Sequence, residues 1–324
     1  MRSNKIILFF LILIVILVIL SQGVTIAAKA DVNLIQYRNK RLVKIQQEKE
    51  NTIDVLVVGD SESYTSISPL ELWGSYGFTS YDCGQSAQKI QETYYMLKTV
   101  LHNQSPKLVV LETNVLFRTQ TGVSGIGESV ADTGNYYFPI FQFHDIWKPF
   151  VFGNRYTVED YKGFIVQDTI ASYNGGEYMK VTKGEDVISD MVKDNMNKII
   201  ELCKENGAKL LLLSTPSPVN YNYQKHNALK EYAKENSLDY LNLNLKTKEL
   251  EINWKTDSMD KGDHLNLMGA HKVTKYFGSY LKANYDLTDH RGDTSYQEWD
   301  DILKKYVKII NDKLSAMQNK ESSI

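Results

Sequence analysis

The chain begins with an apolar run and then alternates between short apolar runs and longer amphipathic patterns. From Ile6 to Leu20 every residue is apolar. Farther along, short apolar runs predict strands, and apolar residues repeating every three or four positions predict helices. The predicted strands are residues 54–59, 78–82, 107–112, 209–214 and 239–243, and the predicted helices are residues 86–102, 188–206 and 224–236.

Two of the predicted strands contain no alternating polar positions. Leu108–Leu111 and Leu210–Leu213 are continuously apolar, as expected for strands buried on both faces of a parallel sheet. Strands and helices also alternate along the chain, which is typical of βαβ units. The pattern therefore predicts an α/β fold, a three-layer α/β/α sandwich with a central parallel sheet, preceded by one transmembrane helix.

The N-terminal apolar run is long enough to enter a membrane. It follows Arg2 and Lys5 and continues, with interruptions, to Ala28, so residues 6–28 are expected to contact the lipid bilayer. One alternative is an uncleaved single-pass anchor with an extracytoplasmic domain. The other is a signal peptide cleaved at the small-x-small site Ala28–Ala30, which would leave a secreted protein. The anchor is favoured, because the unbroken run is at the upper limit for a signal peptide.

The whole chain divides into segments of different character. We expect an N-terminal membrane segment at 1–30, a linker at 31–51, a catalytic domain at 52–290 and a C-terminal helix at 291–324. Residues 115–185 interrupt the βαβ pattern, and an insertion of this length is typically a lid or binding surface. Its aromatic residues predict either a polymer-binding groove or a local core: Tyr136, Tyr137, Phe138, Phe141, Phe143, Trp147, Phe150, Phe152 and Tyr156.

Composition excludes several classes of function. The formal net charge is −2, which argues against a nucleic-acid partner, because such surfaces need clustered Lys and Arg. Cys83 and Cys203 are the only cysteines, and the six histidines are scattered, so no metal site is predicted. The chain has no glycine-rich nucleotide-binding motif. No cofactor is expected.

Small and polar residues follow the predicted strands. Ser61 follows the first strand, Gly84 the second and Asn114 the third. In a parallel sheet these carboxyl ends meet at one edge, where ligands bind. A serine hydroxyl is a weak nucleophile that needs a histidine base and an acid to orient that base. Asp263 and His264 supply both residue types some two hundred residues later.

These residues resemble the four sequence blocks of the SGNH, or GDSL-like, hydrolases. Gly59-Asp60-Ser61 resembles the first block, Gly84 the second, Asn114 the third and His264 the last, in family order over residues 52–285. The resemblance implies a flavodoxin-like fold and a serine esterase or acyltransferase. It also implies that Ser61 is the nucleophile, with His264 as its base. The oxyanion would be bound by the N–H groups of Ser61 and Gly84 and by the side-chain amide of Asn114.

The position of the acid departs from the family pattern. The family places an acid three residues before the histidine, where this chain has Lys261. A one-residue insertion would keep Asp260 as the acid, whereas Asp263, next to the histidine, would need a turn to reach the ring. Both stay open, and Asp260 is favoured.

The membrane segment together with this domain is similar to bacterial cell-surface acyl-transfer proteins, those of teichoic-acid D-alanylation and of alginate or peptidoglycan O-acetylation. This similarity implies an extracytoplasmic O-acyltransferase or esterase that acts on acyl esters, in particular acetyl esters, of a cell-surface polysaccharide or teichoic-acid-like polymer. A membrane-bound O-acyltransferase is then the expected partner. The alternative is a non-catalytic domain that binds the polymer or serves as a scaffold for that acyltransferase.

Overall fold

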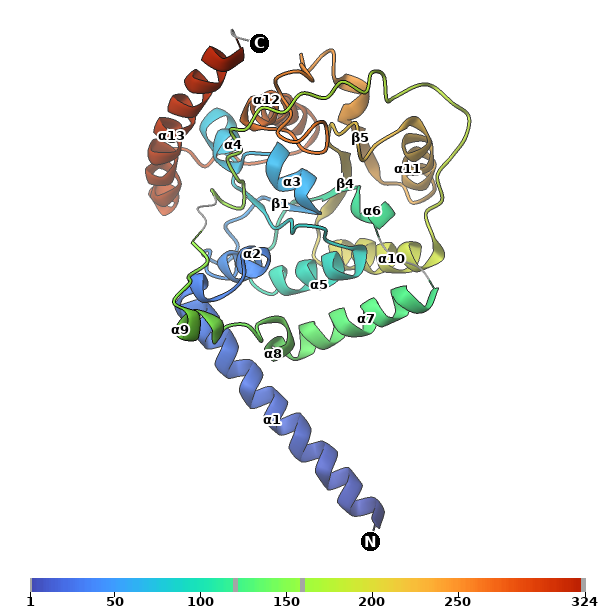
Figure 1. Ribbon diagram of the computed structural model, residues 1–324, viewed down its shortest axis with the longest axis vertical. Helices are drawn as coiled ribbons and strands as arrows, with labels where there is room; N and C mark the ends of the chain where they lie inside the picture. The colour runs from blue at the N-terminus through green and yellow to red at the C-terminus, as the bar shows by residue number, and fades with distance from the viewer. Residues whose placement is uncertain (1, 119–121, 158–160, 322–324) are drawn as a thin grey trace. The chain divides into compact units, whose positions relative to one another are not determined.

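The computed structural model describes residues 2–118, 122–157 and 161–321 (Figure 1). The chain forms two compact units, one from residues 1–48 and 120–158 and the other from residues 49–119 and 159–324. The first unit contains α1 (Arg2–Ala30), the 3-10 turn η1 (Val32–Leu34), α2 (Tyr37–Ile45), α7 (Gly122–Tyr137), α8 (Pro139–Gln142) and α9 (Lys148–Phe152).

The second unit is built on a sheet of five parallel strands in the order β2-β1-β3-β4-β5. Strand β1 lies between β2 and β3, and its Val55 is opposite Ser80 of β2 and Leu108 of β3. Every strand residue is buried except Lys209, Asp239 and Tyr240, which explains the continuously apolar runs. The strands are β1 (Val55–Val58), β2 (Ser80–Asp82), β3 (Leu108–Glu112), β4 (Lys209–Ser214) and β5 (Asp239–Asn242).

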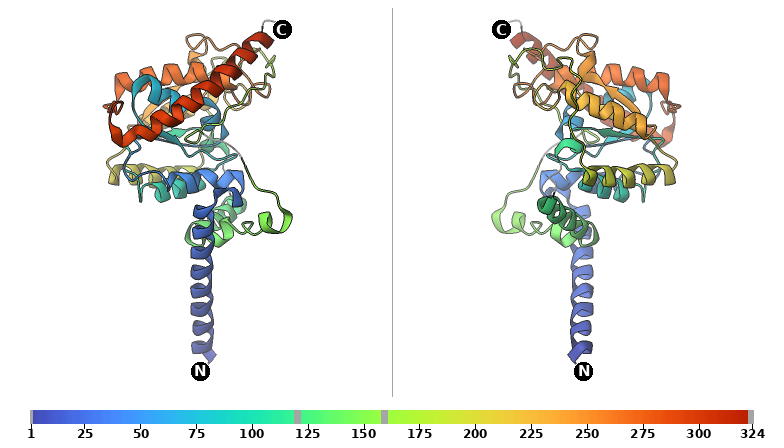
Figure 2. Two further views of the ribbon diagram at one scale, coloured as in Figure 1. Left: turned by 90° about the vertical axis from the view of Figure 1, so that its left-hand side faces the viewer. Right: turned by 90° about the vertical axis from the view of Figure 1, so that its right-hand side faces the viewer.

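Helices cover both faces of this sheet. On one face Val55 and Val57 belong to one buried cluster with Leu72 of α4 and with Val273 and Phe277 of α12. Figure 2 shows α5 and α10 on the opposite face. The predicted three-layer α/β fold with a parallel sheet is therefore confirmed. The helices of this unit are α3 (Ser61–Ser66), α4 (Pro69–Tyr76), α5 (Ile90–Val100), α6 (Val115–Arg118), α10 (Asp190–Glu205), α11 (Tyr223–Glu235), α12 (Leu267–Asn284) and α13 (Gln297–Glu321), with 3-10 turns η2 (Leu243–Lys246) and η3 (Thr294–Tyr296).

Helix α5 begins four residues later than the predicted 86–102. The backbone N–H of Lys89 donates to Glu92 at 3.0 Å, which closes a capping box. Upstream, Gln88 N–H donates to the Gln85 carbonyl at 3.0 Å in a turn. Residues 86–89 therefore belong to the turn after β2 and not to the helix.

The segments outside the sheet are also ordered. Residues 31–51, expected as a linker, hold η1 and α2. Within the expected insertion 115–185, residues 119–121 and 158–160 lie outside the described residues. The part at 122–157 belongs to the first unit and is mostly helical, whereas 161–185 belongs to the second unit and has no helix. Helix α1 is long and apolar enough over Asn4–Ala30 to cross a membrane.

Candidate active site

Ser61 lies where β1 turns into α3. The turn needs glycine at position 59, because its φ is 154° and an added Cβ would lie 2.5 Å from the Cβ of Glu112. Asp60 then caps α3 by accepting the N–H of Glu62 at 3.3 Å. The close approach of β1 and β3 thus places Ser61 at the carboxyl edge of the sheet, as predicted from the sequence.

His264 and Asp260 form a hydrogen-bonded chain with Ser61. The Nε2 atom of His264 lies 2.7 Å from Ser61 Oγ, and its Nδ1 atom lies 2.6 Å from Asp260 Oδ2. The backbone N–H of His264 also donates to Asp260 Oδ1 at 2.7 Å. One carboxylate therefore holds both the ring and the main chain of the histidine, so that Nε2 faces the hydroxyl.

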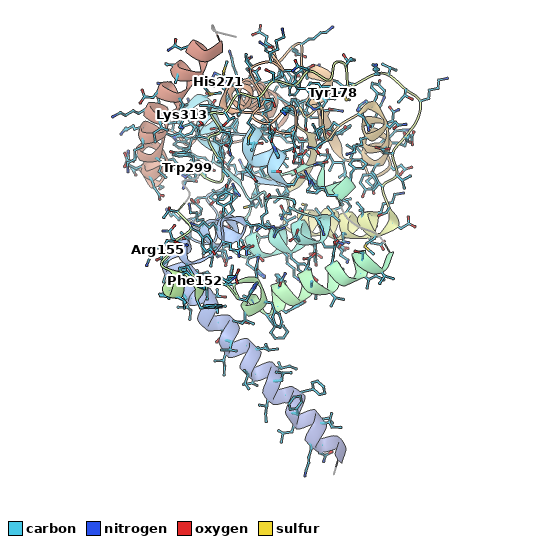
Figure 3. All side chains as sticks on the ribbon, viewed as in Figure 1. Phe152, Arg155, Tyr178, His271, Trp299 and Lys313 are labelled. Carbon is cyan, nitrogen blue, oxygen red and sulfur yellow. The ribbon has the colours of Figure 1, made fainter. Side chains whose placement is uncertain are left out.

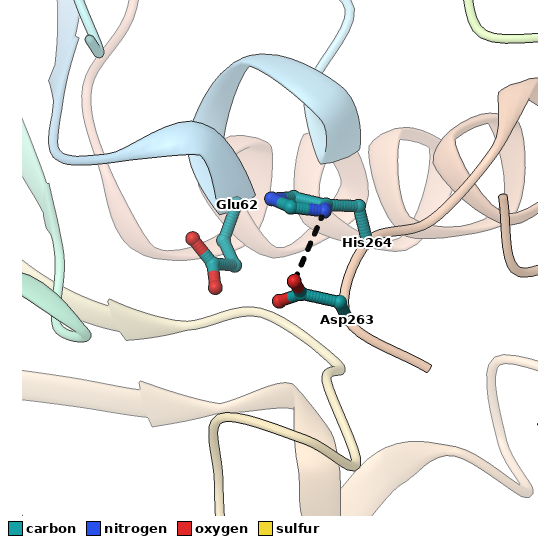
Figure 4. Close-up of side chains that lie close together, drawn as sticks. All are labelled: Glu62, Asp263 and His264. Atoms are coloured by element: carbon teal, nitrogen blue, oxygen red, sulfur yellow. Dashed lines mark ion pairs between the residues drawn. The ribbon is translucent and has the colours of Figure 1, made fainter. Parts of the chain in front are cut away.

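Asp263 lies beside the same ring but is directed elsewhere. Its Oδ2 atom is 3.8 Å from His264 Nδ1 (Figure 4), and its Oδ1 atom accepts from Asn220 Nδ2 at 2.5 Å. The extra residue before the histidine is absorbed by two consecutive left-handed residues, Lys261 with φ 66° and Gly262 with φ 95°. Of the two candidate acids, the structure brings Asp260 into hydrogen-bond contact with the ring.

The pKa shifts of His264 and Asp260 are consistent with proton transfer along the hydrogen bonds from Ser61 to Asp260. Burial opposes the charged form of His264, but the hydrogen bond to Asp260 and the charges of Asp263, Asp260 and Asp60 outweigh it and raise the pKa of the imidazole. For Asp260, burial is outweighed by hydrogen bonds from His264, and the pKa of this carboxyl is lowered. An ionised Asp260 can only accept, so the Nδ1 atom carries the hydrogen.

Residues 161–185, the second part of the insertion, support the histidine loop, which is residues 258–267. The N–H of Lys261 donates to the Ala171 carbonyl at 3.1 Å, and the N–H of Leu267 donates to the Gln167 carbonyl at 2.7 Å. An added Cβ at Gly262 would lie 2.8 Å from the ring of Tyr173. Tyr173 packs edge-on against Trp254, with ring centroids 6.1 Å apart. Its neighbour in this aromatic cluster, Tyr178, is labelled in Figure 3.

Three carboxyl groups close to Ser61 are buried: Asp60, Glu62 and Glu112. Burial and the charge of Asp60 raise the pKa of Glu62 and of Glu112 well above the usual range, which favours their protonated forms. The Oε2 atom of Glu62 lies 3.4 Å from Ser61 Oγ.

Cationic and amide donors surround these carboxylates. Arg118 forms an ion pair with Asp60 and a second one, at 3.5 Å, with Glu62. Asn220 donates to Glu62 as well as to Asp263, and the Tyr221 hydroxyl donates to Glu112. Through Asn220, the carboxyl group beside Ser61 is thus linked to the carboxyl group beside His264.

The predicted oxyanion donors are engaged within this network. The N–H of Gly84 donates to Asp82 Oδ1 at 2.7 Å. The side-chain amide of Asn114 donates to Asp60 Oδ2 at 2.9 Å and to Glu62 Oε1 at 3.0 Å. Two of the three predicted donors therefore already have carboxylate acceptors, and the third is the N–H of Ser61.

A glycine at a strand end can let a substrate approach the backbone closely, but Gly84 is needed for a different reason. An added Cβ would lie 2.1 Å from Ser63 Oγ and 2.8 Å from the Asp60 carbonyl. Close packing between the ends of β1 and β2 thus accounts for this glycine.

Two groups of side chains have the geometry of metal ligands. Ligand atoms of Glu62, Asp263 and His264 lie within 4.8 Å of one another, as do those of Asp60, Glu62 and Glu112. Arg118 and Asn220 already donate to carboxylates of these groups. The arrangement is accounted for by protein donors, and the absence of a metal stays a prediction.

Comparison with known proteins adds a distant likeness of fold. No family model matches the chain, and no curated protein matches it. A GDSL-like lipase from Bacteroides thetaiotaomicron shares 14% identity over 74% of this chain and 91% of that one, with a TM-score of 0.36. A protein described as an acylhydrolase, from Bacteroides fragilis, shares 14% identity over 76% and 98%, with a TM-score of 0.40. At such low scores the likeness carries no argument, so any assignment depends on the geometry of the site.

Proposed function

We propose that the chain is a serine-dependent acyl-ester hydrolase or O-acyltransferase that acts through an acyl-enzyme. The observation that carries this proposal is the continuous hydrogen-bonded chain from Ser61 Oγ through both nitrogens of His264 to Asp260, with contacts of 2.7 and 2.6 Å. A base within hydrogen-bond reach of the nucleophile and an acid that fixes its tautomer are what ester cleavage by serine requires.

The proposed reaction proceeds in two halves. Ser61 Oγ attacks the ester carbonyl while His264 Nε2 takes the hydroxyl proton, and the imidazolium is stabilised by Asp260. The same proton then passes to the oxygen of the leaving alcohol, and the acyl group stays on Ser61. In the second half, water or a sugar hydroxyl loses its proton to His264 and attacks the acyl carbonyl. The bond between the acyl group and Ser61 Oγ then breaks, and His264 returns the proton to Ser61 Oγ. The N–H of Ser61 is the proposed first donor to the oxyanion.

The proposed substrate is an acyl ester, such as an acetyl ester, of a cell-surface polysaccharide or teichoic-acid-like polymer. This proposal depends on the sequence resemblance and on α1, which is apolar enough for a single-pass anchor. A membrane-bound O-acyltransferase that supplies the acyl group is the proposed partner, and an extracytoplasmic domain at the cell membrane the proposed location.

Labelling with a fluorophosphonate tests the nucleophile. We expect one adduct per chain, located by peptide mapping on Ser61 and absent from Ser61→Ala. Ser63→Ala is the matched control, because Ser63 lies two residues farther along α3 and bonds Asp60 and Asp82 rather than His264. A folded wild-type protein that takes up no probe would contradict the proposal.

The fate of the acyl group is tested with a chromogenic acetyl ester. If the protein is a transferase, adding an acceptor glycan should raise the rate of alcohol release and yield acetylated glycan. Release that ignores the acceptor and yields only acetate would assign the protein as a hydrolase.

A non-catalytic polymer-binding or scaffold role is the second candidate. The carboxylate partners of Gly84 N–H and of Asn114 favour it, because they occupy donors that an oxyanion would need. In cells, this role predicts that Ser61→Ala retains polymer modification whereas deletion of residues 52–290 abolishes it. Loss of modification in Ser61→Ala would exclude the role.

A further inference from the structure

Helix α7 carries an apolar stripe that its own unit leaves exposed. Val123, Ile126, Val130 and Tyr137 follow one another at intervals of three, four and seven residues, so they share one helix face. They are exposed by 89%, 58%, 67% and 59%. Such a continuous apolar face is typical of a helix that contacts another apolar phase.

The apolar exposure continues through the next two helices. Phe141 in α8, Trp147 before α9, and Phe150 and Phe152 within α9 are all exposed, by 47% to 71%. Phe152 is labelled in Figure 3 together with Arg155. These four aromatic rings thus add to the exposed apolar surface of α7 within the same compact unit.

Helix α8 is held against the C-terminal third of α1. The N–H of Ile140 donates to Ser21 Oγ at 3.3 Å, and Phe143 is buried in one cluster with Ala28. Figures 1 and 2 show α7 and α8 near the C-terminal end of α1, with α7 running across the direction of α1 rather than alongside it. Within this unit, the contacts fix the level of α8 along α1.

That level corresponds to the edge of a bilayer. A helix needs about 20 residues to cross the hydrocarbon core, so a span that starts at Ile6 ends near Thr25. The contact of Ile140 with Ser21 lies just before this position, and the packing of Phe143 with Ala28 lies just after it. Helix α7, which runs across α1, would then lie in the plane of the interface. An amphipathic helix in this plane and aromatic rings at this depth are typical of interfacial membrane contact.

We infer that residues 122–152 form a membrane-contact surface that rests on the lipid interface around the C-terminal end of α1. The occupant is the bilayer itself, because the exposed stripe of α7 carries no charge and the next helix, α8, packs against α1, whose side chains lipid would cover. The inference depends on α1 lying in a bilayer and is independent of the chemistry at Ser61.

Spin labels on α7 test this surface in the full chain reconstituted into phosphatidylcholine/phosphatidylglycerol nanodiscs. Val130→Cys places a label on the apolar stripe. Ala131→Cys is the matched control, also exposed but rotated by roughly 100° around the helix. The wild-type chain, whose two cysteines are buried, supplies the background. We expect the Val130→Cys label to be more accessible to oxygen and less accessible to a nickel chelate than the Ala131→Cys label.

Three results would overturn the inference. Equal, high accessibility of both labels to the nickel chelate would place α7 in water. Low accessibility to both reagents at Val130→Cys would show that protein covers the stripe, as a membrane-protein partner or a second copy would. Failure of the chain to co-elute with lipid would show that α1 does not lie in the bilayer. As a second measurement, the fluorescence of Trp147 is obtained as the difference between the wild type and Trp147→Phe. Brominated lipids should quench this fluorescence, and a lack of quenching would also contradict the inference.

Discussion

Two sets of carboxyl groups near Ser61 are in opposite states. Asp260 is partly exposed and bonded to His264, and its pKa is lowered. Glu62 and Glu112 are buried near Asp60, and their pKa values are raised. Surroundings rather than residue type therefore separate a carboxylate that can stabilise an imidazolium from carboxyls that hold protons and tie up donors.

The largest expected effect comes from removing the charge of Asp260. In Asp260→Asn the amide can no longer stabilise the imidazolium or fix the tautomer, so the rate of fluorophosphonate labelling should fall by about 10³- to 10⁴-fold. Rates are compared at pH 8, with circular dichroism to confirm folding. Asp263→Asn, which leaves the Nδ1 contact intact, should stay within about tenfold of wild type. Equal losses of labelling rate in the two variants would contradict the assignment of Asp260, rather than Asp263, as the acid that acts on His264.

The next largest effect is expected on stability, from removing the charge of Arg118 beside the buried carboxyl groups. Arg118→Met keeps the aliphatic stem but leaves the fully buried Asp60 without its cationic partner. Asp60 is fully buried and the Arg118 side chain is 31% exposed, so breaking this pair should lower the free energy of unfolding by about 3 kcal/mol, the lower end for a buried pair, measured by urea denaturation. Lys234→Met, which removes an exposed pair with Glu231, should change it by about 0.5 kcal/mol or less. Similar losses in both would show that the buried network contributes no more than a surface pair.

A smaller effect, of opposite sign, is expected for Glu112. Its raised pKa means that the folded state holds a proton which the unfolded state loses above about pH 4.3. This contribution to stability is complete below that pH and is lost as the pH rises through the folded-state pKa. Glu112→Gln cannot ionise, so relative to wild type it should gain of the order of 1 kcal/mol between pH 5 and pH 8.

The same denaturation series at both pH values checks this prediction. Glu231→Gln, on the exposed side of α11, is the control and should show no such gain. A constant difference between Glu112→Gln and wild type would mean that Glu112 is ionised in the fold.

The smallest effect concerns the pH dependence of the reaction. His264 must be neutral to act as a base, and its raised pKa places the rise in labelling rate above the usual histidine range, about pH 6.5. Asp263 contributes to this by its charge, so Asp263→Asn should move the inflection to lower pH. A profile measured from pH 5 to pH 9 checks the direction, and a shift to higher pH would contradict it.

The fold could be predicted because its signals are local. Leu108–Leu111 and Leu210–Leu213 are continuously apolar in sequence and buried on both faces in the sheet. Ser61, Gly84 and Asn114 follow strands that are neighbours in the sheet, so a parallel order alone brings them to one edge.

The parts of the site that were missed depend on contacts distant in sequence. Arg118 and Asn220 join Glu62 from separate segments, and no pattern in the chain links these three residues. The choice between Asp260 and Asp263 depends on left-handed conformations at Lys261 and Gly262, and a lysine gives no sign of such a conformation. The backbone contacts of residues 167–171 with the histidine loop leave no trace in side-chain identity.

The separation between Ser61 and His264 also decides when the proposed reactivity can arise. The two residues are 203 positions apart, and the main chain around His264 is held by hydrogen bonds that it donates to the carbonyls of Gln167 and Ala171. Contacts this distant close late in folding, because a long loop must be ordered first. During synthesis and any passage through a membrane, the serine therefore has no base within reach, and the proposed nucleophile is assembled only when the last quarter of the chain has folded around it.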